Sequence, residues 1–213
     1  MNTITVALFP IPNAVNFPGV PCPLHVFEPR YRKMVKHCLD NDMLMGVCHT
    51  EKILHSNKKQ QTLEDTLNSN QSTYKPCTVF SAGKVEILEE LEDGRMAIMV
   101  DMAQRLELQQ EVQTLPFGIW QCTPVQDSPV EDHASLEQLK KDLLAQLLVV
   151  TQESPDAQDI LNGEYWNTIS ATEFSFAING LLGMDASLKQ HLLEMTVAED
   201  RLNYLLALIN NSE

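Results

Sequence analysis

Apolar and polar residues alternate differently in successive parts of the chain, and each pattern predicts a different kind of element. Short apolar runs rich in β-branched residues predict strands over residues 4–9, 24–27 and 43–49. Between the last two, apolar residues recur at intervals of three and four over residues 31–39, which is typical of an amphipathic helix. Pro29 suits the first position of this helix, where a missing N–H costs nothing.

From residue 79 the period falls to two, which predicts a strand with one buried face over residues 79–91. Asp93-Gly94 follows, and this pair provides the positive φ angles that a tight hairpin turn requires. Residues 95–100 then return as the second strand of the hairpin, and residues 118–125 form the last predicted strand. This is the clearest hairpin in the sequence.

Beyond residue 128 the pattern becomes helical to the end of the chain. Ser135-Leu-Glu-Gln138 and Ser170-Ala-Thr-Glu173 both match the capping box that starts a helix. Thr196-Val-Ala-Glu199 opens the last helix. We therefore expect a compact bundle of four or five helices over residues 128–213.

Two stretches interrupt these patterns. Six of the 11 prolines fall between Leu8 and Leu39, and a central strand cannot contain prolines at that density. This crossing is therefore a rigid loop or a sheet edge. Residues 55–75 are rich in Ser, Asn, Gln, Thr and Lys without periodicity, which predicts a mobile surface loop.

Composition is that of a globular protein with a core, because 44% of the 213 residues are hydrophobic. There is no apolar run long enough to span a membrane and no N-terminal signal pattern, so we expect a cytoplasmic protein with no membrane partner. The net charge is −14, and residues 129–213 carry 14 Asp or Glu against four Lys or Arg. Such acidity argues against nucleic acid as a partner, because its phosphates would be repelled.

The cysteines and histidines do not form a recognisable site. The five cysteines are an odd number at wide spacings without a CxxC pair, so we expect buried reduced thiols. The six histidines contain no HExxH pattern. We therefore predict no metal and no cofactor.

One long motif resembles a known family. Phe9-Pro10, Pro23-Leu24-His25 and two further segments closely resemble the opening of the amino-terminal, substrate-binding domain of Lon protease. In the helical half, Lys189-Gln190 and Arg201-Leu202 occur in the same order as in that family. The two further segments give the structural family motif, which is Phe17, Pro18, Gly19, Phe27, Glu28, Pro29, Arg30 and Tyr31.

The resemblance implies a fold and a class of function. The fold is α+β: a PUA-like six-stranded β-barrel with one docked helix over residues 1–127, followed by an all-helical bundle over residues 128–213. The family domain is non-catalytic, and the chain looks like a stand-alone copy without the ATPase and peptidase parts. Its implied partners are unfolded or hydrophobic polypeptides and an ATP-dependent protease, in protein quality control; weak homo-oligomers are also allowed.

The residues themselves indicate binding more than catalysis. Gly83-Lys84 is followed by Val85, so the chain has no phosphate-binding loop. Glu28 and Arg30 are the best polar candidates for a hidden hydrolase, but a structural pair at the start of the helix is the simpler interpretation. A ligand- or RNA-sensing module of the cereblon-like or PUA-like kind is the other alternative. For polypeptide binding, we predict a groove between barrel and bundle lined by Phe117, Trp120, Tyr165 and Trp166.

Overall fold

The computed structural model describes residues 3–55 and 73–210. The chain divides into two compact units. The first contains the residues up to Val125 together with residues 183–193, and the second contains residues 126–182 and the residues from Glu194 onward. The domains expected at residues 1–127 and 128–213 stay a prediction, to which the structure adds that residues 183–193 fold with the strands.

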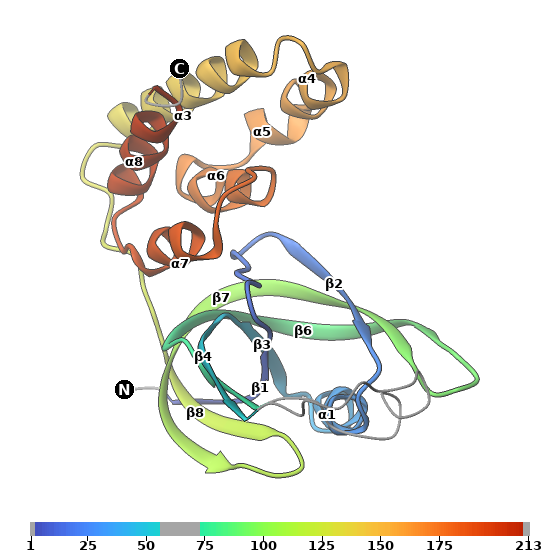
Figure 1. The fold of residues 1–213 in the computed structure, drawn as a ribbon. Helices are drawn as coiled ribbons and strands as arrows, with labels where there is room; N and C mark the ends of the chain where they lie inside the picture. The colour runs from blue at the N-terminus through green and yellow to red at the C-terminus, as the bar shows by residue number, and fades with distance from the viewer. Residues whose placement is uncertain (1–2, 56–72, 211–213) are drawn as a thin grey trace. The chain divides into compact units, whose positions relative to one another are not determined.

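The first unit is a barrel built on one six-stranded sheet (Figure 1). The strand order is β2-β7-β6-β3-β1-β8, and β7 also pairs with β8, so five of the six strands close into a ring. The predicted α+β class with a barrel-like six-stranded sheet is confirmed, with β2 outside the closed ring. The strands are β1 (Ile4–Pro10), β2 (Pro21–Val26), β3 (Leu44–Cys48), β4 (Thr50–His55), β5 (Thr73–Pro76), β6 (Val79–Glu90), β7 (Met96–Gln113) and β8 (Gly118–Pro124).

Strand β7 closes the ring because it changes partners along its length. Its residues 96–101 pair with β2, its residues 96–107 pair with β6, and its residues 106–113 pair with β8. A register shift between Ala82 and Gly83 marks a bulge where β6 and β7 come together. Bulges increase local twist and bend the strand, as a closed ring requires.

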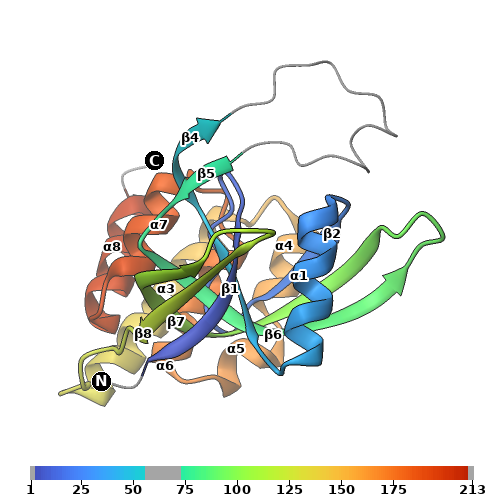
Figure 2. The same cartoon turned by 90° about the horizontal axis from the view of Figure 1, so that it is seen from below.

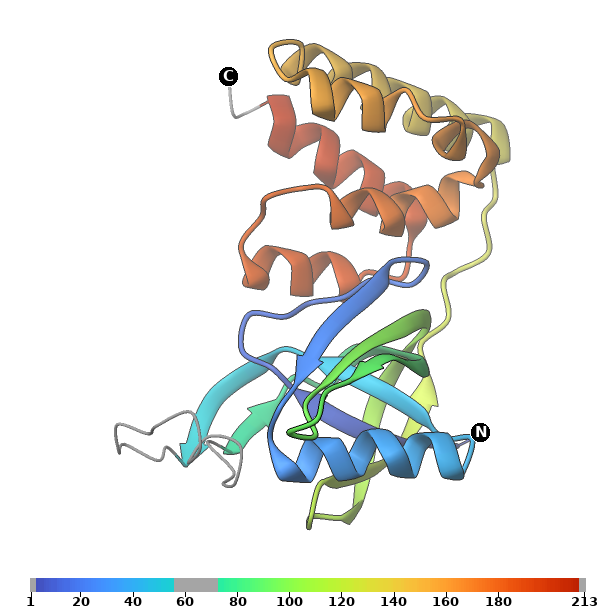
Figure 3. The ribbon, with the colours of Figure 1, turned by 90° about the vertical axis from the view of Figure 1, so that its right-hand side faces the viewer.

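Strands β4 and β5 form a two-stranded ribbon that continues the pairing of β3 with β6. In Figures 2 and 3 this ribbon projects away from the ring. The sequence predicted neither strand. Residues 73–75 of β5 lie inside the polar stretch interpreted as a loop over residues 55–75, so that prediction is wrong for these residues. Residues 56–72 of that predicted loop lie outside the described part of the chain.

Strand β2 is an edge strand, as the prolines of the crossing predicted. Among the described strands it pairs only with β7, and it starts at Pro21, three residues before the expected start at Leu24. Pro21 and Pro23 occupy alternate positions of β2 and carry no N–H. The edge of β2 that faces away from β7 therefore lacks a donor at both positions.

Helix α1 (Pro29–Asp40) lies against the strands as predicted (Figure 3). Pro29 is at its first turn, and Glu28 before it is extended with φ −66° and ψ 135°. Its buried face is Tyr31, Met34, Val35 and Cys38. These side chains join a core with Ala7, while Val6 and Leu8 belong to a second core, because successive strand residues point to opposite faces of the sheet.

The predicted hairpin between β6 and β7 is present, but its turn is longer than two residues. Leu91 N–H donates to Arg95 O at 2.8 Å, and Gly94 N–H donates to Leu91 O at 2.8 Å. Of Asp93 and Gly94, only Gly94 has a positive φ, of 81°. The loop is therefore a turn followed by a left-handed glycine, a common alternative to the two-residue turn.

Two buried polar side chains fix helix α7 (Ala186–Glu194) to the barrel. Arg105 of β7, 4% exposed, donates from Nη1 to Leu193 O at 2.6 Å. Gln190 of α7 donates from Nε2 to Val79 O, at the start of β6, at 2.9 Å. A cation at the carboxyl end of a helix also interacts favourably with the helix dipole. These bonds explain why a helix far along the chain belongs to the first unit.

The second unit is helical, and its core contains a fully buried charge. Arg201 is 0% exposed; its Nη1 is 3.1 Å from Asp127 Oδ1 and its Nη2 also bonds Asp127, while its Nε donates to Ser175 Oγ at 3.0 Å. Its guanidinium lies 3.8 Å from the centroid of the Phe176 ring. The elements are α3 (His133–Val150), α4 (Pro155–Leu161), α5 (Glu164–Thr168), α6 (Ala171–Ala177), the 3-10 turn η1 (Ile178–Gly180) and α8 (Ala198–Asn210).

One of the two predicted capping boxes is correct. Ser170 and Glu173 cap α6 reciprocally, as expected, and the Ser170 hydroxyl and N–H hold the pKa of Glu173 below its ordinary value. The box at Ser135 is wrong, because α3 begins earlier. Its cap is Asp132, whose carboxylate accepts from the N–H groups of Ala134 and Ser135 at 3.0 Å each. An aspartate at this position caps as well as a serine does.

We predict that Gly83→Ala disrupts the barrel. A Cβ atom on Gly83 would lie 1.6 Å from Asp101 O, on the backbone of β7, so the two strands would have to separate. The free energy of unfolding should fall by about 3 kcal/mol or more. Chemical denaturation followed by circular dichroism measures this loss. Gly183→Ala is the control, because a Cβ there meets nothing within 4 Å, and an equal loss in both variants would contradict the prediction.

We predict that Asp127→Ala destabilises the helical unit by about 3–5 kcal/mol, because it leaves the buried Arg201 guanidinium without its carboxylate. The exposed pair of Lys36 and Glu90 provides the control. Glu90→Ala should cost less than about 1 kcal/mol, because solvent screens that pair. Thermal unfolding of the two variants compares them directly; similar melting temperatures would show that the buried pair has no special role.

Candidate functional site

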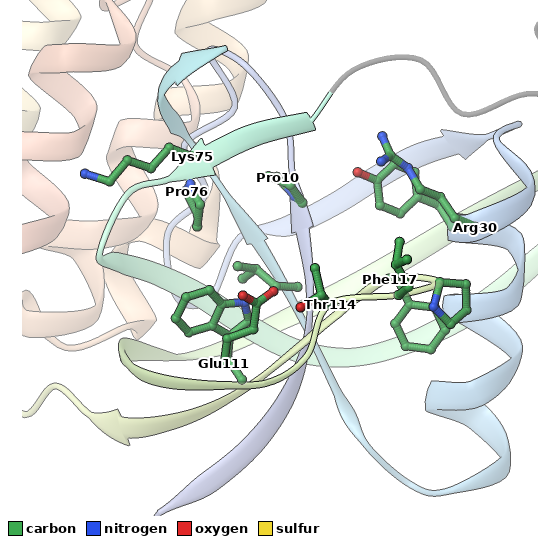
Figure 4. A pocket seen from close by; sticks show the side chains of 13 residues that line it. Pro10, Arg30, Lys75, Pro76, Glu111, Thr114 and Phe117 are labelled. Atoms are coloured by element: carbon green, nitrogen blue, oxygen red, sulfur yellow. The ribbon is translucent and has the colours of Figure 1, made fainter. Parts of the chain in front are cut away.

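A pocket of about 360 Å³ opens at the end of the barrel where the β4–β5 ribbon separates from the ring (Figure 4). Strands β1, β5, β7 and β8 contribute to it, together with the first turn of α1. Every lining residue belongs to the first unit. Barrel mouths are common binding sites, because the strand ends provide rigid walls.

The walls of the pocket are mainly apolar and rigid. Trp120, Phe117 and Tyr31 provide aromatic surface, and Leu8 and the pyrrolidine rings of Pro10, Pro76 and Pro116 fill the spaces between them. Leu115, at the tip of the β7–β8 hairpin, is 78% exposed. A leucine so exposed at the rim of an apolar pocket is typical of a surface that a partner covers.

The junction of β2 and α1 fixes the aromatic and cationic wall. Arg30 Nε donates to Glu28 Oε2 at 3.0 Å, and both side chains are nearly buried. The Tyr31 ring contacts two groups. The Arg30 guanidinium lies 4.5 Å from the centroid of this ring, and the centroid of the Phe9 ring lies 4.0 Å from it. Glu28 and Arg30 therefore form the structural pair that the sequence favoured.

The charged residues that line the pocket come from three elements: Arg30 from α1, Lys75 from β5 and Glu111 from β7. Lys75 of β5 bonds Glu51 of β4, within the ribbon. Glu111 of β7 is exposed and stands opposite Trp120 in the pairing of β7 with β8. Gln113 donates from Nε2 to Phe117 O at 3.0 Å, which holds the hairpin tip in place. Charges of both signs at the rim can orient a bound chain and still leave the apolar walls of the pocket accessible.

The structure brings the predicted binding residues together in pairs. Phe117 and Trp120 both line the barrel pocket, whereas Tyr165 and Trp166 lie on α5 in the second unit. The rings of Tyr165 and Trp166 meet edge to face at 5.0 Å, and Trp166 donates from Nε1 to Ile160 O at 2.8 Å. The predicted groove that joins all four residues stays a prediction.

Most residues of the family motif lie outside the pocket and support the elements around it. Phe17 is 1% exposed in the core, and Gly19 donates its N–H to Met102 O at 2.7 Å. Pro18 and Phe27 are half-buried, and Pro29 starts α1. Of the motif, only Arg30 and Tyr31 line the pocket.

Several lining residues were not predicted from the sequence, of which Leu115, Glu111 and Lys75 matter most. Lys75 falls in the stretch predicted as a loop, and Glu111 lies between the predicted strands. One signal was available for Leu115: a large apolar residue next to Pro116, in the turn between two predicted strands, has no core to enter. No spacing rule reports that β5 and β7 face the same pocket.

Burial makes four of the described cysteines poor nucleophiles. It raises the pKa of Cys22 to about 11 and the pKa values of Cys38 and Cys122 to about 12, and it raises the pKa of Cys48 further. In residues 3–55 and 73–210, no group of three or more His, Cys, Asp or Glu residues could hold a metal ion. Over the same ranges, no helix combines the length and apolarity that crossing a membrane demands.

The model of one protein family matches residues 5–211, and its description is ATP-dependent protease La (LON) substrate-binding domain. Two curated relatives are Lon proteases. The one from Cytophaga hutchinsonii is 27% identical over 95% of this chain, and the one from Parabacteroides distasonis is 24% identical over 97%. The chain spans about a quarter (24%) of the length of each.

Solved structures share the fold. The Lon N-terminal domain protein from Xanthomonas campestris superposes with a TM-score of 0.62 at 19% identity, covering 97% of this chain and 98% of that one. The N-terminal domain of the Mycobacterium avium complex Lon protease gives 0.67 at 14% identity, with the same coverage. The likeness therefore extends over both units.

We predict that the native thiols react slowly. A thiol with a pKa near 11 has about 100-fold less thiolate at pH 8 than one at the ordinary value of 9.0, and only the thiolate attacks an alkylating agent. Iodoacetamide should therefore label Cys22, Cys38, Cys48 and Cys122 at least about 100-fold more slowly in the native protein than in urea. Mass spectrometry gives the rate for each cysteine, and fast native labelling of any of the four would contradict the burial described here.

Proposed function

The chain belongs to the family of ATP-dependent protease La (LON) substrate-binding domains, and on this premise we propose that it binds polypeptides at the barrel pocket without transforming them. The observation that supports this site is an apolar pocket of about 360 Å³ beside a leucine that is 78% exposed. Unfolded chains differ from folded ones mainly in presenting apolar side chains, which such a surface recognises.

The pocket suits one large side chain of the bound polypeptide. An aromatic or branched residue would pack against Trp120 and Tyr31, and the neighbouring residues of the bound chain would cover Leu115. Binding of this kind needs no acid, base or nucleophile. Glu28, the strongest catalytic candidate in the sequence, is instead held by Arg30.

The same proposal extends to partners and place. We infer that the protein acts in the cytoplasm as an adaptor or regulator in protein quality control, and that it presents bound polypeptides to an ATP-dependent protease. Support comes from the curated relatives, both Lon proteases, in which the matched region makes up about a quarter of the chain. Co-precipitation with such a protease from native extract, lost when the pocket is altered, tests this extension.

We predict that Leu115→Ser weakens binding of a fluorescent unfolded casein or an apolar peptide by about tenfold, because an exposed apolar contact of the rim is removed. Trp120→Ala, which removes the largest apolar wall, should weaken it by about 30-fold. Fluorescence anisotropy without ATP measures both. Leu88→Ser is the matched control, since Leu88 is 56% exposed and lies outside the pocket.

The three variants separate the possible outcomes. Leu115 and Leu88 are both exposed, so neither serine should change stability much, whereas Trp120→Ala needs a circular dichroism spectrum to show that it is folded. Equal binding by Leu115→Ser and Leu88→Ser would move the site away from this pocket. No binding by the unaltered protein would reject polypeptide recognition itself.

A further inference from the structure

The barrel pocket lies in a fork of the sheet. Strands β6 and β7 pair as far as Val79 and Glu107, and Leu108 N–H still donates to Thr78 O at 2.9 Å. Beyond this point β5, which precedes β6, pairs with β4, while β7 continues with β8. The two strands therefore separate, and the pocket is lined by Lys75 and Pro76 from β5 and by Glu111 and Thr114 from β7 and the turn after it (Figure 4).

The fork leaves one edge of β7 open. In residues 109–113, Gln110, Glu111 and Gln113 pair with β8 on one side, with register shifts at Gln109 and Val112, and no strand in the described ranges pairs with the other side of this segment. An unpaired edge presents a row of N–H and C=O groups on which an extended peptide can add as a new strand. The open edge of β2 is a poorer site, because Pro21 and Pro23 have no N–H to donate.

The sheet register specifies what such a strand would meet. Glu111 stands directly opposite Trp120, so the two side chains share one face of the sheet, and both line the pocket. A residue of the added strand beside Glu111 would extend the same row, within reach of its carboxylate. In the described part of the chain, Glu111 forms no salt bridge, whereas Lys75 is paired with Glu51.

From this geometry we propose that the bound polypeptide is an extended segment that adds to the 109–113 edge of β7, with apolar residues in the pocket and a Lys or Arg beside Glu111. This inference rests on the proposed function and specifies its ligand. The net charge of −14 favours the same class of segment, since acidic chains would be repelled. Backbone pairing supplies affinity for any sequence, while the pocket and Glu111 select among sequences.

Peptides with blocked backbone donors test the strand pairing. The parent peptide is a short apolar segment with one central Lys, and two derivatives carry N-methyl groups on either the odd or the even residues. In an added strand, only alternate N–H groups face β7. One derivative should therefore bind at least about tenfold more weakly, and the other within about twofold of the parent.

The other results would overturn the inference in distinguishable ways. Equal binding by both derivatives, whether unchanged or equally weakened, would reject pairing on a single edge and leave the proposed function standing. Failure of the parent peptide to bind would reject the proposed function, and the inference with it. Amide hydrogen exchange is a second measurement: exchange in residues 109–113 should slow with the parent peptide, and unchanged exchange there would contradict the pairing.

A charge exchange tests the role of Glu111. Glu111→Lys should lower the affinity for the Lys peptide by about tenfold or more. A peptide with Glu in place of that Lys should bind the variant about as tightly as the Lys peptide binds the unaltered protein. Glu86→Lys is the matched control, because Glu86 is also exposed on the sheet but lies outside the pocket. Equal effects at Glu111 and Glu86 would reduce the charge preference to a long-range effect and reject the specific contact.

Discussion

The barrel depends on one constraint, which is that β7 must pair with β2, β6 and β8 along a single 18-residue strand. One edge of β7 pairs first with β2 and then with β8, and the other edge pairs with β6. The bulge at Gly83 lets β6 and β7 approach until a Cβ atom no longer fits, and beyond Leu108 β7 loses β6 and keeps β8. The ring therefore closes on one edge of β7, and the fork opens on the other.

The family motif acts on this framework from the other side. Phe17 fills the core, and the N–H of Gly19 bonds β7 at Met102. Glu28 and Arg30 then fix the first turn of α1, so that Tyr31 faces the pocket against Phe9. A motif long enough to identify the family thus serves mainly to hold one wall of the pocket in place, and the other lining residues come from β1, β5, β7, β8 and the hairpin tip.

Local patterns predicted what local physics decides. The strands β1, β3 and β8, helix α1 with its proline start and the capping box of α6 all follow from residues close together in the chain. The pairing of β4 with β5 could not be predicted, because this short ribbon protrudes from the ring and its polar residues lack the alternating pattern that marks a strand with one buried face. The attachment of α7 to the barrel depends on Arg105 bonding Leu193, 88 residues away, and no periodicity reports such a contact. For the same reason, Phe117 and Trp120 were recognisable as candidates but the rest of the pocket was not.

The prolines of β2 have a further consequence for how the protein behaves at high concentration. A sheet edge with free donors can recruit the same edge of another copy and begin a stack of strands, which is the first step towards fibrils. Pro21 and Pro23 deny that edge its alternate donors, and β8, at the other end of the strand order, is paired with both β1 and β7. Growth by stacking of copies is thereby blocked at both ends of the strand order, whereas the short 109–113 edge of β7 keeps its donors.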